Sequence, residues 1–306
     1  PGTTTDTVAP ILKEAGYDPG EDIYVAYSPE RILPGQMLEE LVQNSRVVGG
    51  INKNSTLAAR DVYKVFVKGN IELTDSKTAE MVKLMENTYR DVNIAIANEF
   101  SRISDEYDID INEAINIANY HPRVNIMKPG IGVGGHCISV DPWFLVDASP
   151  GNSDLVRTAR TINDNQPAFF VESIEKRVGK LNGLNVSALG LTYKPDIDDY
   201  RESPSLDVIK LLISKGASVR AYDPHVEINF KEGAVFSSSI EESIKDADII
   251  LILVGHSIFT NLDPNIIAAK TKSRIIFDPV GICKKEDWKS CGFKIFSLAG
   301  SRIESF

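Results

Sequence analysis

The most constraining feature of the chain is a helical pattern that runs without interruption from residue 76 to residue 109. A periodic stretch longer than about 25 residues is typical of a helix that joins two domains or packs against a partner subunit. The apolar residues recur every three or four positions, which places them on one helical face; they include Met81, Leu84, Met85, Tyr89, Val92 and Ile96. The sequence therefore predicts one long central helix.

Segments with strand and helix character alternate on both sides of this helix. Before it, residues 22–32, 45–51 and 70–75 have the β-branched and aromatic residues of strands, and 54–67 reads as an amphipathic helix. From residue 185 the alternation resumes. This order predicts an α/β fold with Rossmann-like domains joined by the long helix. We expect three regions, at 1–74, 75–180 and 181–306.

Several helix ends are marked by particular residues. Gly16 is expected to close a helix that begins near residue 3, and Asn54 or Ser55 is expected to cap the helix before residue 67. Asp141 followed by Pro142 predicts another helix start. Residues 152–183 are expected to be helical throughout.

Charge and composition exclude some functions. The formal net charge of −10 argues against a general nucleic-acid surface, which needs clustered Lys and Arg. No apolar run reaches the roughly 20 residues that span a bilayer, and no signal pattern opens the sequence. We therefore expect no membrane partner. Three cysteines cannot form a disulfide framework, and we expect a reducing, cytoplasmic location.

The segment GVGGHCISVD, residues 132–141, combines a glycine-rich turn with a thiol and a carboxylate. Counted from Gly132, a dinucleotide fingerprint GxGxxG would need Gly134 and a Gly or Ala at position 137, which is Cys137. A metal site is disfavoured because His136 and Cys137 are adjacent and the other histidines are scattered, so we expect no metal. A buried core cysteine and a catalytic nucleophile both remain open. Gly134 and Gly135 favour the second, since they let the backbone approach a ligand closely.

Three other groups of residues are candidates for a binding or catalytic site. Lys83 and Asn87 are spaced i to i+4 and share one face of the long helix. Glu30 and Arg31 follow a predicted strand. Lys194 and Arg201 belong to the segment LTYKPDIDDYRESP, which forms a loop at the carboxyl end of the strand that begins near residue 185. Ligands bind at such strand ends, and the two cations could contact a diphosphate there. Each group taken singly is also common on a solvated surface.

Taken together, the motifs resemble those of one family. PGTT, YSPERILPG, AEMVKLMENTYRDVNIAIANEF, GVGGHCISVDPWFL and GLTYKPDIDDYRESP are similar, in this order, to segments of the UDP-glucose/GDP-mannose group of nucleotide-sugar dehydrogenases. The resemblance covers essentially all 306 residues. It implies NAD as the cofactor, a UDP-sugar as substrate and oxidation of the sugar C6 alcohol to a carboxylate without a metal.

The resemblance also implies roles for individual residues. Cys137 would capture the C6 aldehyde, Lys83 and Asn87 would stabilise the oxyanion, and Asp141 and Glu30 would assist hydrolysis. Arg201 would contact the cofactor. The residues expected to bind the substrate are Arg31, Arg123, Gly134, Gly135, His136 and Lys194, with Arg123 reaching the substrate of a neighbouring subunit. We expect a homodimer with the active site near the subunit interface.

Within this resemblance, Trp143 and Phe144, which follow the cysteine, are similar to the form that acts on UDP-N-acetyl-D-mannosamine, and this implies that sugar nucleotide as the substrate. UDP-N-acetylglucosamine is the alternative within the family. A non-catalytic UDP-sugar-binding or dimerisation fragment is an alternative of another class. The hydroxyacid dehydrogenases share the helical core, but they need no cysteine at position 137.

One departure from the family concerns the N-terminal region. The family begins with a Rossmann domain that carries GxGxxG, and residues 1–74 of this sequence contain no such segment. We therefore expect the chain to be truncated, with the NAD-binding domain largely missing and 1–74 as its C-terminal part. The regions 75–180 and 181–306 would be the dimerisation and catalytic domain and the UDP-sugar-binding domain. Such a chain would bind the UDP-sugar without turning it over.

Overall fold

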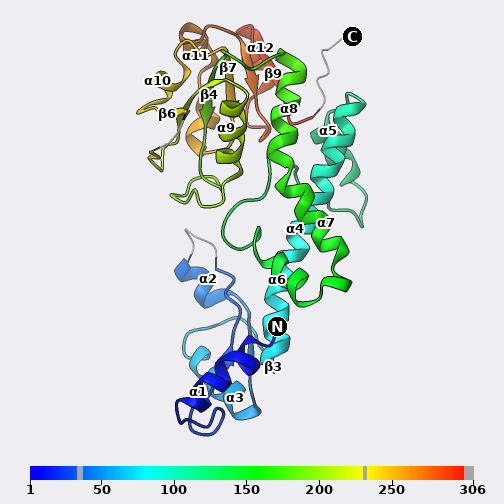
Figure 1. Cartoon of the computed structure of the whole chain (residues 1–306), viewed down its shortest axis with the longest axis vertical. Helices are drawn as coiled ribbons and strands as arrows, with labels where there is room; N and C mark the ends of the chain where they lie inside the picture. The colour runs from blue at the N-terminus through cyan, green and yellow to red at the C-terminus, as the bar shows by residue number, and fades with distance from the viewer. Residues whose placement is uncertain (33–36, 230–232, 300–306) are drawn as a thin grey trace. The chain divides into compact units, whose positions relative to one another are not determined.

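The computed structural model describes residues 1–32, 37–229 and 233–299 and confirms the α/β class (Figure 1). The chain divides into two compact units. Unit 1 comprises residues 1–89 and 144–152, and unit 2 comprises residues 90–143 and 153–306. The predicted long helix is confirmed as α4, Ser76–Glu106, which passes from one unit into the other.

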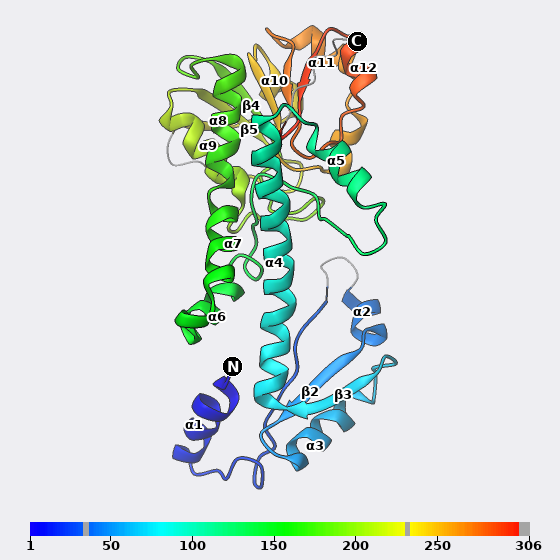
Figure 2. The same cartoon turned by 90° about the vertical axis from the view of Figure 1, so that its right-hand side faces the viewer.

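Unit 1 contains a small sheet in the order β1-β2-β3, with bounds Ala26–Tyr27, Arg46–Gly50 and Ile71–Asp75. β2 and β3 run parallel and side by side, as Figure 2 shows, and β1 pairs antiparallel with β2. The connections contain η1 (Thr3–Val8), α1 (Ala9–Glu14), α2 (Met37–Gln43) and α3 (Lys53–Tyr63). The parallel pair with its intervening helix α3 is the βαβ arrangement expected from the alternating pattern.

The start of α4 anchors the N-terminal segment of unit 1. The Glu80 carboxylate accepts hydrogen bonds from the backbone N–H of Thr4 at 2.8 Å, from the Thr4 hydroxyl and from the backbone N–H of Gly2. Partial burial would raise the pKa of Glu80, but these hydrogen bonds outweigh it and hold the pKa below its ordinary value. The carboxylate thus ties the PGTT segment to the helix.

Two local expectations for unit 1 are wrong. Of the predicted strand 22–32 only Ala26–Tyr27 pairs in the sheet. The cap of α3 is Asn52, whose side chain accepts from the Ser55 N–H at 2.8 Å, and the helix begins earlier than the apolar periodicity suggested. Residues 33–35, the end of the YSPERILPG motif, lie outside the described residues.

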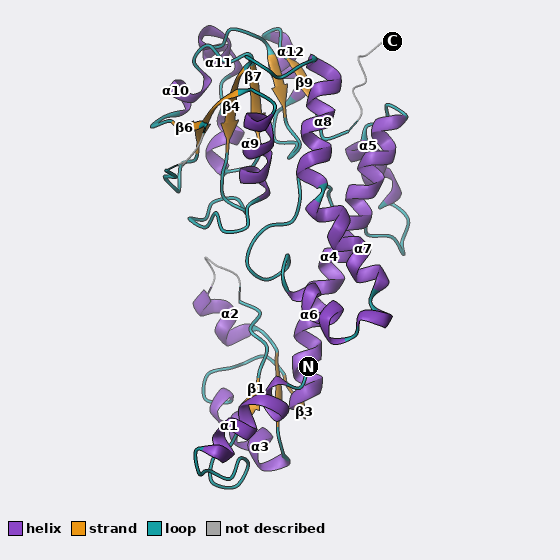
Figure 3. Ribbon diagram, in the orientation of Figure 1, coloured by secondary structure: helices purple, strands orange, loops and turns teal. Residues whose placement is uncertain are grey.

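Unit 2 is built on a six-stranded parallel sheet in the order β6-β5-β4-β7-β8-β9 (Figure 3). In this order the strands span Ala234–Phe236, Ser218–Tyr222, Asn185–Leu189, Ile249–Ile252, Ile275–Phe277 and Lys294–Phe296. The order reverses at β4, which lies between β5 and β7. In doubly wound folds, ligands bind near such a reversal, outside the carboxyl ends of the strands.

Helices cover both faces of this sheet. The bounds of the helical elements of unit 2, beside α4, are α5 Ile111–Ala118, α6 Asp141–Ala148 (which continues into unit 1), α7 Asp154–Asp164, α8 Gln166–Val178, α9 Pro204–Ser214, α10 Ile240–Ile244, η3 Ser257–Asn261, α11 Pro264–Lys270 and α12 Lys285–Ser290. A short 3-10 turn η2, Pro150–Asn152, belongs to unit 1.

Strand β7 illustrates why both faces are apolar. Ile249 and Leu251 belong to the core that α8 and α9 form with the sheet, whereas Ile250 and Ile252 belong to the core formed by α10, α11 and α12. Side chains alternate between the faces of a strand, so a parallel strand covered on both sides is an uninterrupted apolar run.

The central helices of unit 2 are held together by a buried polar network. Asp91 on α4 is fully buried and pairs with Arg160 of α7 at 2.5 Å. Asn163 donates to the Asp91 carboxylate at 2.8 Å and accepts from Asn98 at 2.8 Å. Removing one partner of such a buried pair typically costs about 3–5 kcal/mol. The network therefore fixes the packing of α7 against α4.

The expectation of continuous helix over 152–183 is wrong within this range and at its end, where α8 stops at Val178. The chain breaks at Asn165, between α7 and α8, and Pro167 occupies the first turn of α8. Proline cannot donate the hydrogen bond that a helix interior requires, but it fits a helix start. Among the described residues, no helix is both long enough and apolar enough to cross a membrane.

The close packing of β2 against β3 at Gly49 gives a stability prediction. A Cβ added at Gly49 on β2 would lie 2.2 Å from the carbonyl oxygen of Asp75 on β3. We expect Gly49→Ala to lower the free energy of unfolding by about 1–3 kcal/mol, because overpacking pushes the two strands apart. Chemical denaturation measures the change. Gly151→Ala is the matched control, since a Cβ there meets no atom within 4 Å; equal stability of the two variants would contradict the prediction.

Candidate functional site

Cys137 lies in unit 2, in the loop between α5 and α6, and is half-buried. The backbone N–H of Gly130, in the middle of this loop, donates to the buried Asn98 side chain at 2.9 Å. At its end, the N–H groups of Val140 and Asp141 donate to the Cys137 carbonyl at 3.0 and 2.8 Å. The thiol is therefore held at the turn that starts α6, as the sequence predicted.

The glycines before Cys137 have a different neighbour from the one we expected. A Cβ at Gly134 would lie 2.5 Å from the Glu202 carbonyl oxygen, and a Cβ at Gly135 would lie 2.9 Å from the Tyr193 ring. Gly135 also has a positive φ of 86°, which disfavours other residues. In this structure the backbone closely approaches the loop after β4. The two glycines thus let the Cys137 loop pack closely against the loop after β4.

The loop after β4 carries the charged candidates of unit 2. Arg201 is exposed and forms an ion pair with Asp199 of the same loop at 2.6 Å. The hydrogen bond to Asp199 raises the pKa of Arg201, and the same bond lowers the pKa of Asp199. Lys194 is half-buried and directly follows Tyr193 in the same loop. Because the Tyr193 ring packs against Gly135, the Cys137 loop and the loop that carries Lys194 lie side by side.

Tyr193 is a site residue that the sequence reasoning missed. Burial raises the pKa of its hydroxyl, and the negative charges of Asp199 and of an ionised Cys137 add to the effect. Arg201 acts in the opposite direction. The only available signal in the sequence was its position beside Lys194, which does not reveal that its ring packs on Gly135.

The histidines are less scattered than the sequence suggested. The rings of His225 and His256 lie 4.9 Å apart, and Asp196 approaches both at 3.6 and 3.7 Å. They come from the loops after β5, β7 and β4, which meet at the carboxyl edge of the parallel sheet. Sequence spacing could not show this, because the three residues are separated by long crossovers.

In unit 1, Glu30 and Lys83 are brought together. The Lys83 ammonium donates to the backbone carbonyl of Glu30 at 2.9 Å. Partial burial would raise the pKa of Glu30, but hydrogen bonds from the N–H groups of Ile32 and Arg31 and from Arg46 outweigh it and hold the pKa below its ordinary value. Glu30 is thus a carboxylate near neutral pH and can accept a proton.

Arg46 is a second residue that sequence reasoning missed. Its side chain is buried at 1% exposure, pairs with Glu30 at 3.2 Å and lies over the ring of Tyr63. Arg31 is instead engaged by Glu86 on α4, with its Nε 3.1 Å from a carboxylate oxygen. The sequence offered one indication of a role for Arg46, which is a charged residue at the first position of the strand β2.

The other predicted residues take separate positions. Asn87 is half-buried on α4 in unit 1. In unit 2, Asp141 is the first residue of α6, His136 is exposed one residue before the thiol, and Arg123 is exposed in the turn after α5. Asp141 lies one helical turn beyond Cys137, as the spacing predicted.

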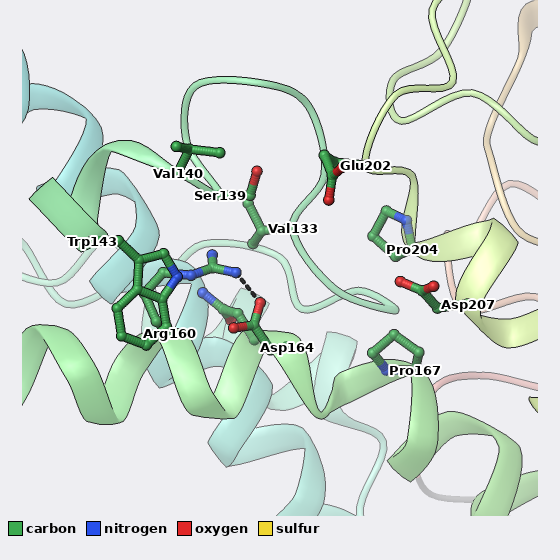
Figure 4. A pocket seen from close by; sticks show the side chains of 11 residues that line it. Val133, Ser139, Val140, Trp143, Arg160, Asp164, Pro167, Glu202, Pro204 and Asp207 are labelled. Carbon is green, nitrogen blue, oxygen red and sulfur yellow. Dashed lines mark hydrogen bonds and ion pairs between the residues drawn. The ribbon is translucent and has the colours of Figure 1, made fainter.

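A cavity of about 410 Å³ flanks the Cys137 loop in unit 2 (Figure 4). Val133, Ser139 and Val140 of this loop line one side. Figure 4 shows the ion pair of Arg160 with Asp164 on another side, beside Trp143. The remaining lining residues are Asn163, Pro167, Glu202, Pro204 and Asp207. Cys137 itself does not line this cavity.

The other two cysteines differ chemically from Cys137. Burial raises the pKa of Cys283, and the neighbouring Asp278 raises it further, so its thiolate is strongly disfavoured. Cys291 donates from its thiol to the Asn265 side chain at 3.2 Å. Of the three thiols, only Cys137 lies beside the charged loop after β4, which makes it the candidate nucleophile.

Comparison with family models matches three parts of the chain to the UDP-glucose/GDP-mannose dehydrogenase family. Its NAD binding domain matches residues 1–67, its central domain 77–165 and its UDP binding domain 187–285. Our expectations of a truncated chain, of a largely missing NAD-binding domain and of resulting inactivity are therefore not supported. They rested on GxGxxG, which is a single turn of such a domain, whereas the match extends over the strands and helices of residues 1–67.

Individual relatives agree with this match. The UDP-N-acetyl-D-mannosamine dehydrogenase of Methanocaldococcus jannaschii is 48% identical over 99% of this chain and 69% of its own length. Among solved structures, UDP-D-ManNAc dehydrogenase from Pyrococcus horikoshii has a TM-score of 0.88 at 41% identity, covering 97% of this chain and 70% of that one. UDP-N-acetyl-mannosamine dehydrogenase from Staphylococcus aureus has a TM-score of 0.87 at 44% identity, with 98% and 70% covered. The chain belongs to the UDP-glucose/GDP-mannose dehydrogenase family.

Proposed function

We propose that this protein oxidises the C6 alcohol of UDP-N-acetyl-D-mannosamine to UDP-N-acetyl-D-mannosaminuronate, a four-electron oxidation that uses two NAD. The names of the relatives support this substrate. The observation that carries the chemistry is the half-buried Cys137 thiol, seated by Gly134 and Gly135 against the loop that bears Lys194. The relatives do not favour UDP-N-acetylglucosamine or a non-catalytic role.

The oxidation passes through an aldehyde, and we propose that Cys137 retains it. The sulfur adds to the aldehyde carbon, and the aldehyde oxygen takes a proton, which gives a thiohemiacetal. Loss of hydride from C6 and of the proton from the hydroxyl oxygen converts this adduct into a thioester. Water then adds to the carbonyl carbon, the carbon–sulfur bond breaks, and the products are the carboxylate and the free thiol.

Lys83 and Asn87 are the proposed donors to the C6 oxygen. A cation and an amide one turn apart on α4 can stabilise each oxyanion of this sequence, and removing one such donor typically costs about 10²–10³ in rate. Asp141 and Glu30 are the proposed carboxylates for hydrolysis. The lowered pKa of Glu30 keeps this carboxylate ionised, as a general base must be, but it also makes Glu30 a weaker base than an ordinary glutamate.

We assign substrate binding to Lys194, Arg123 and Arg31 and to the segment of Gly134, Gly135 and His136. Lys194 and Arg123 have no carboxylate of the described residues within ion-pair distance, so their charges are available to an anionic sugar nucleotide. Arg31 already pairs with Glu86, which leaves less charge for a ligand. Its contribution is therefore expected to be smaller.

Arg201 is the proposed contact to the cofactor. NAD carries a diphosphate and, when bound, accepts the hydride from C6. The exposed guanidinium of Arg201, oriented by Asp199, fits an anionic diphosphate in charge and in hydrogen-bonding capacity. We further propose that residues 1–74 belong to the NAD-binding domain, 75–180 to the dimerisation and catalytic domain, and 181–306 to the UDP-sugar-binding domain, and that the enzyme acts in the cytoplasm.

The nucleophile is tested by Cys137→Ser. We expect this variant to lose net oxidation while it still binds the UDP-sugar, because serine cannot form the thiohemiacetal at a comparable rate. NADH absorbance measures the oxidation, and calorimetry measures the binding. Cys291→Ser is the matched control and should retain activity. If Cys137→Ser oxidised the substrate at the wild-type rate, the assignment of Cys137 as the nucleophile would be wrong.

The substrate is tested by calorimetric titration of the chain with three ligands. We expect UDP-N-acetylmannosamine to bind about tenfold or more tightly (~1.4 kcal/mol) than UDP-N-acetylglucosamine or UDP-glucose. Equal dissociation constants for the three ligands would remove the proposed preference for the mannosamine epimer.

We also propose that α4 forms the core of a homodimer. Large apolar side chains lie exposed along one stripe of this helix: Met85, Tyr89, Ile96, Phe100, Ile103 and the adjoining Tyr107. An exposed apolar patch of this kind commonly marks a surface that binds another protein chain. Light scattering at micromolar concentration should give the mass of two chains. A monomer mass at this concentration would contradict the proposal.

A further inference from the structure

A buried histidine joins three loops at the carboxyl edge of the unit 2 sheet. His256, after β7, is 0% exposed, and its Nε2 lies 3.0 Å from the carboxylate of Asp223, after β5. Its Nδ1 accepts the backbone N–H of Asp196, in the loop after β4, at 3.0 Å. Because Nδ1 is the acceptor, Nε2 carries the ring hydrogen and faces Asp223.

Asp223 receives further donors from the β4 loop. The N–H groups of Leu191 and Thr192 donate to the same carboxylate oxygen at 2.6 and 3.2 Å, and the N–H of His225 donates to the other at 2.8 Å. Burial would raise the pKa of Asp223, but the hydrogen bonds from His256, Leu191 and His225 outweigh it and lower the pKa. The carboxylate is thus a fixed anchor for the start of the β4 loop.

Asp196 anchors the same loop farther along. Its backbone has a φ of +59°, which is uncommon for a residue other than glycine. Beside the bond to His256, its carboxylate accepts from the N–H of Ser257 at 2.9 Å and from the Ser257 hydroxyl at 2.6 Å. The left-handed conformation is therefore stabilised from outside the loop, by the residues that follow β7.

Lys194 lies between these two anchors. Its carbonyl accepts from the Thr192 hydroxyl at 2.9 Å, and the neighbouring Tyr193 N–H donates to the Asp199 carbonyl at 3.1 Å. His256 contacts the loop on both sides of Lys194, through Asp223 before it and through Asp196 after it. The direction in which Lys194 leaves the backbone thus depends on His256.

The same group of atoms could be considered a metal site. Ligand atoms of Asp196, His225 and His256 lie within 4.8 Å of one another. However, a metal needs the lone pair of Nδ1, which already accepts the Asp196 N–H, and Nε2 faces Asp223. Both ring nitrogens are therefore committed to the loops.

We propose that His256 is a positioning residue, which sets Lys194 for the UDP-sugar by holding the backbone N–H of Asp196. This inference rests on the proposed function, in which Lys194 contacts the substrate. His256 touches no reacting group itself. It acts through the loop between β4 and α9, and the bond at Nδ1 is the part of the network that matters for ligand affinity.

Two substitutions separate positioning from stability. His256→Asn keeps an acceptor near the Asp196 N–H and loses the donor to Asp223, whereas His256→Gln keeps a donor near Asp223 and loses the acceptor. We expect Gln to raise the dissociation constant of UDP-N-acetylmannosamine about tenfold and Asn to raise it less. Asn should lower the melting temperature more, because it leaves a buried carboxylate with one donor fewer. If the same variant, His256→Asn or His256→Gln, caused both the larger loss of affinity and the larger drop in melting temperature, the proposal would be overturned.

A double-mutant cycle tests whether the effect passes through Lys194. In a Lys194→Ala background, His256→Gln should change the dissociation constant by less than about twofold, since the group that it positions is gone. A full tenfold loss in that background would show that His256 acts by another route. Wild-type chain that fails to bind the ligand at all would instead refute the proposed function, which keeps the two failures distinct.

Ser257→Ala offers a variant with little risk to folding, because Ser257 is exposed. It removes the hydroxyl bond to Asp196, and we expect a two- to threefold rise in the dissociation constant, which is at the low end of what one hydrogen bond contributes. Ser214→Ala, which removes the exposed bond of Ser214 to Leu211, is the matched control and should leave binding unchanged. Loss of binding in EDTA that zinc restores would favour the metal site and contradict positioning.

Discussion

The buried carboxylate of Asp223 is the interaction on which the binding edge of unit 2 depends. It accepts hydrogen bonds from two backbone N–H groups of the loop after β4 and faces His256 after β7. A buried charge is costly unless donors surround it. The desolvation cost of Asp223 is offset only while these donors remain in place. The loops after β4 and β7 must therefore keep the conformation in which they donate to this carboxylate.

A second constraint fixes the other side of the Cys137 loop. Asn98 on α4 accepts from the Gly130 N–H, and Asn98 is in turn bonded to Asn163, which contacts Asp91. The thiol loop therefore lies between a polar network in the helices and the loop after β4. Gly134 and Gly135 are required there because two loops, each fixed by its own network, leave no room for a Cβ.

Local patterns in the sequence predicted much of the fold. The period of α4, the helix start at Asp141 and the apolar run of β7 each depend on neighbours in the chain, and each was found. The family resemblance was also carried by contiguous motifs, and the family models confirm it. Prediction failed at two places: α3 begins earlier than expected, because Asn52 caps it, and most of residues 22–32 stay outside the sheet.

The sequence by itself determined the α/β class, the family and the position of the thiol before a helix, since these follow from periodicity and from residues close together in the chain. Tertiary structure alone decided that Tyr193 seats Gly135, that Arg46 pairs with Glu30 and that His256 joins Asp196 to Asp223. These partners are separated by 16 to 60 residues in the chain. Their pairing is selected by the burial of charge and by the parallel register of the sheet, neither of which is visible in a local pattern.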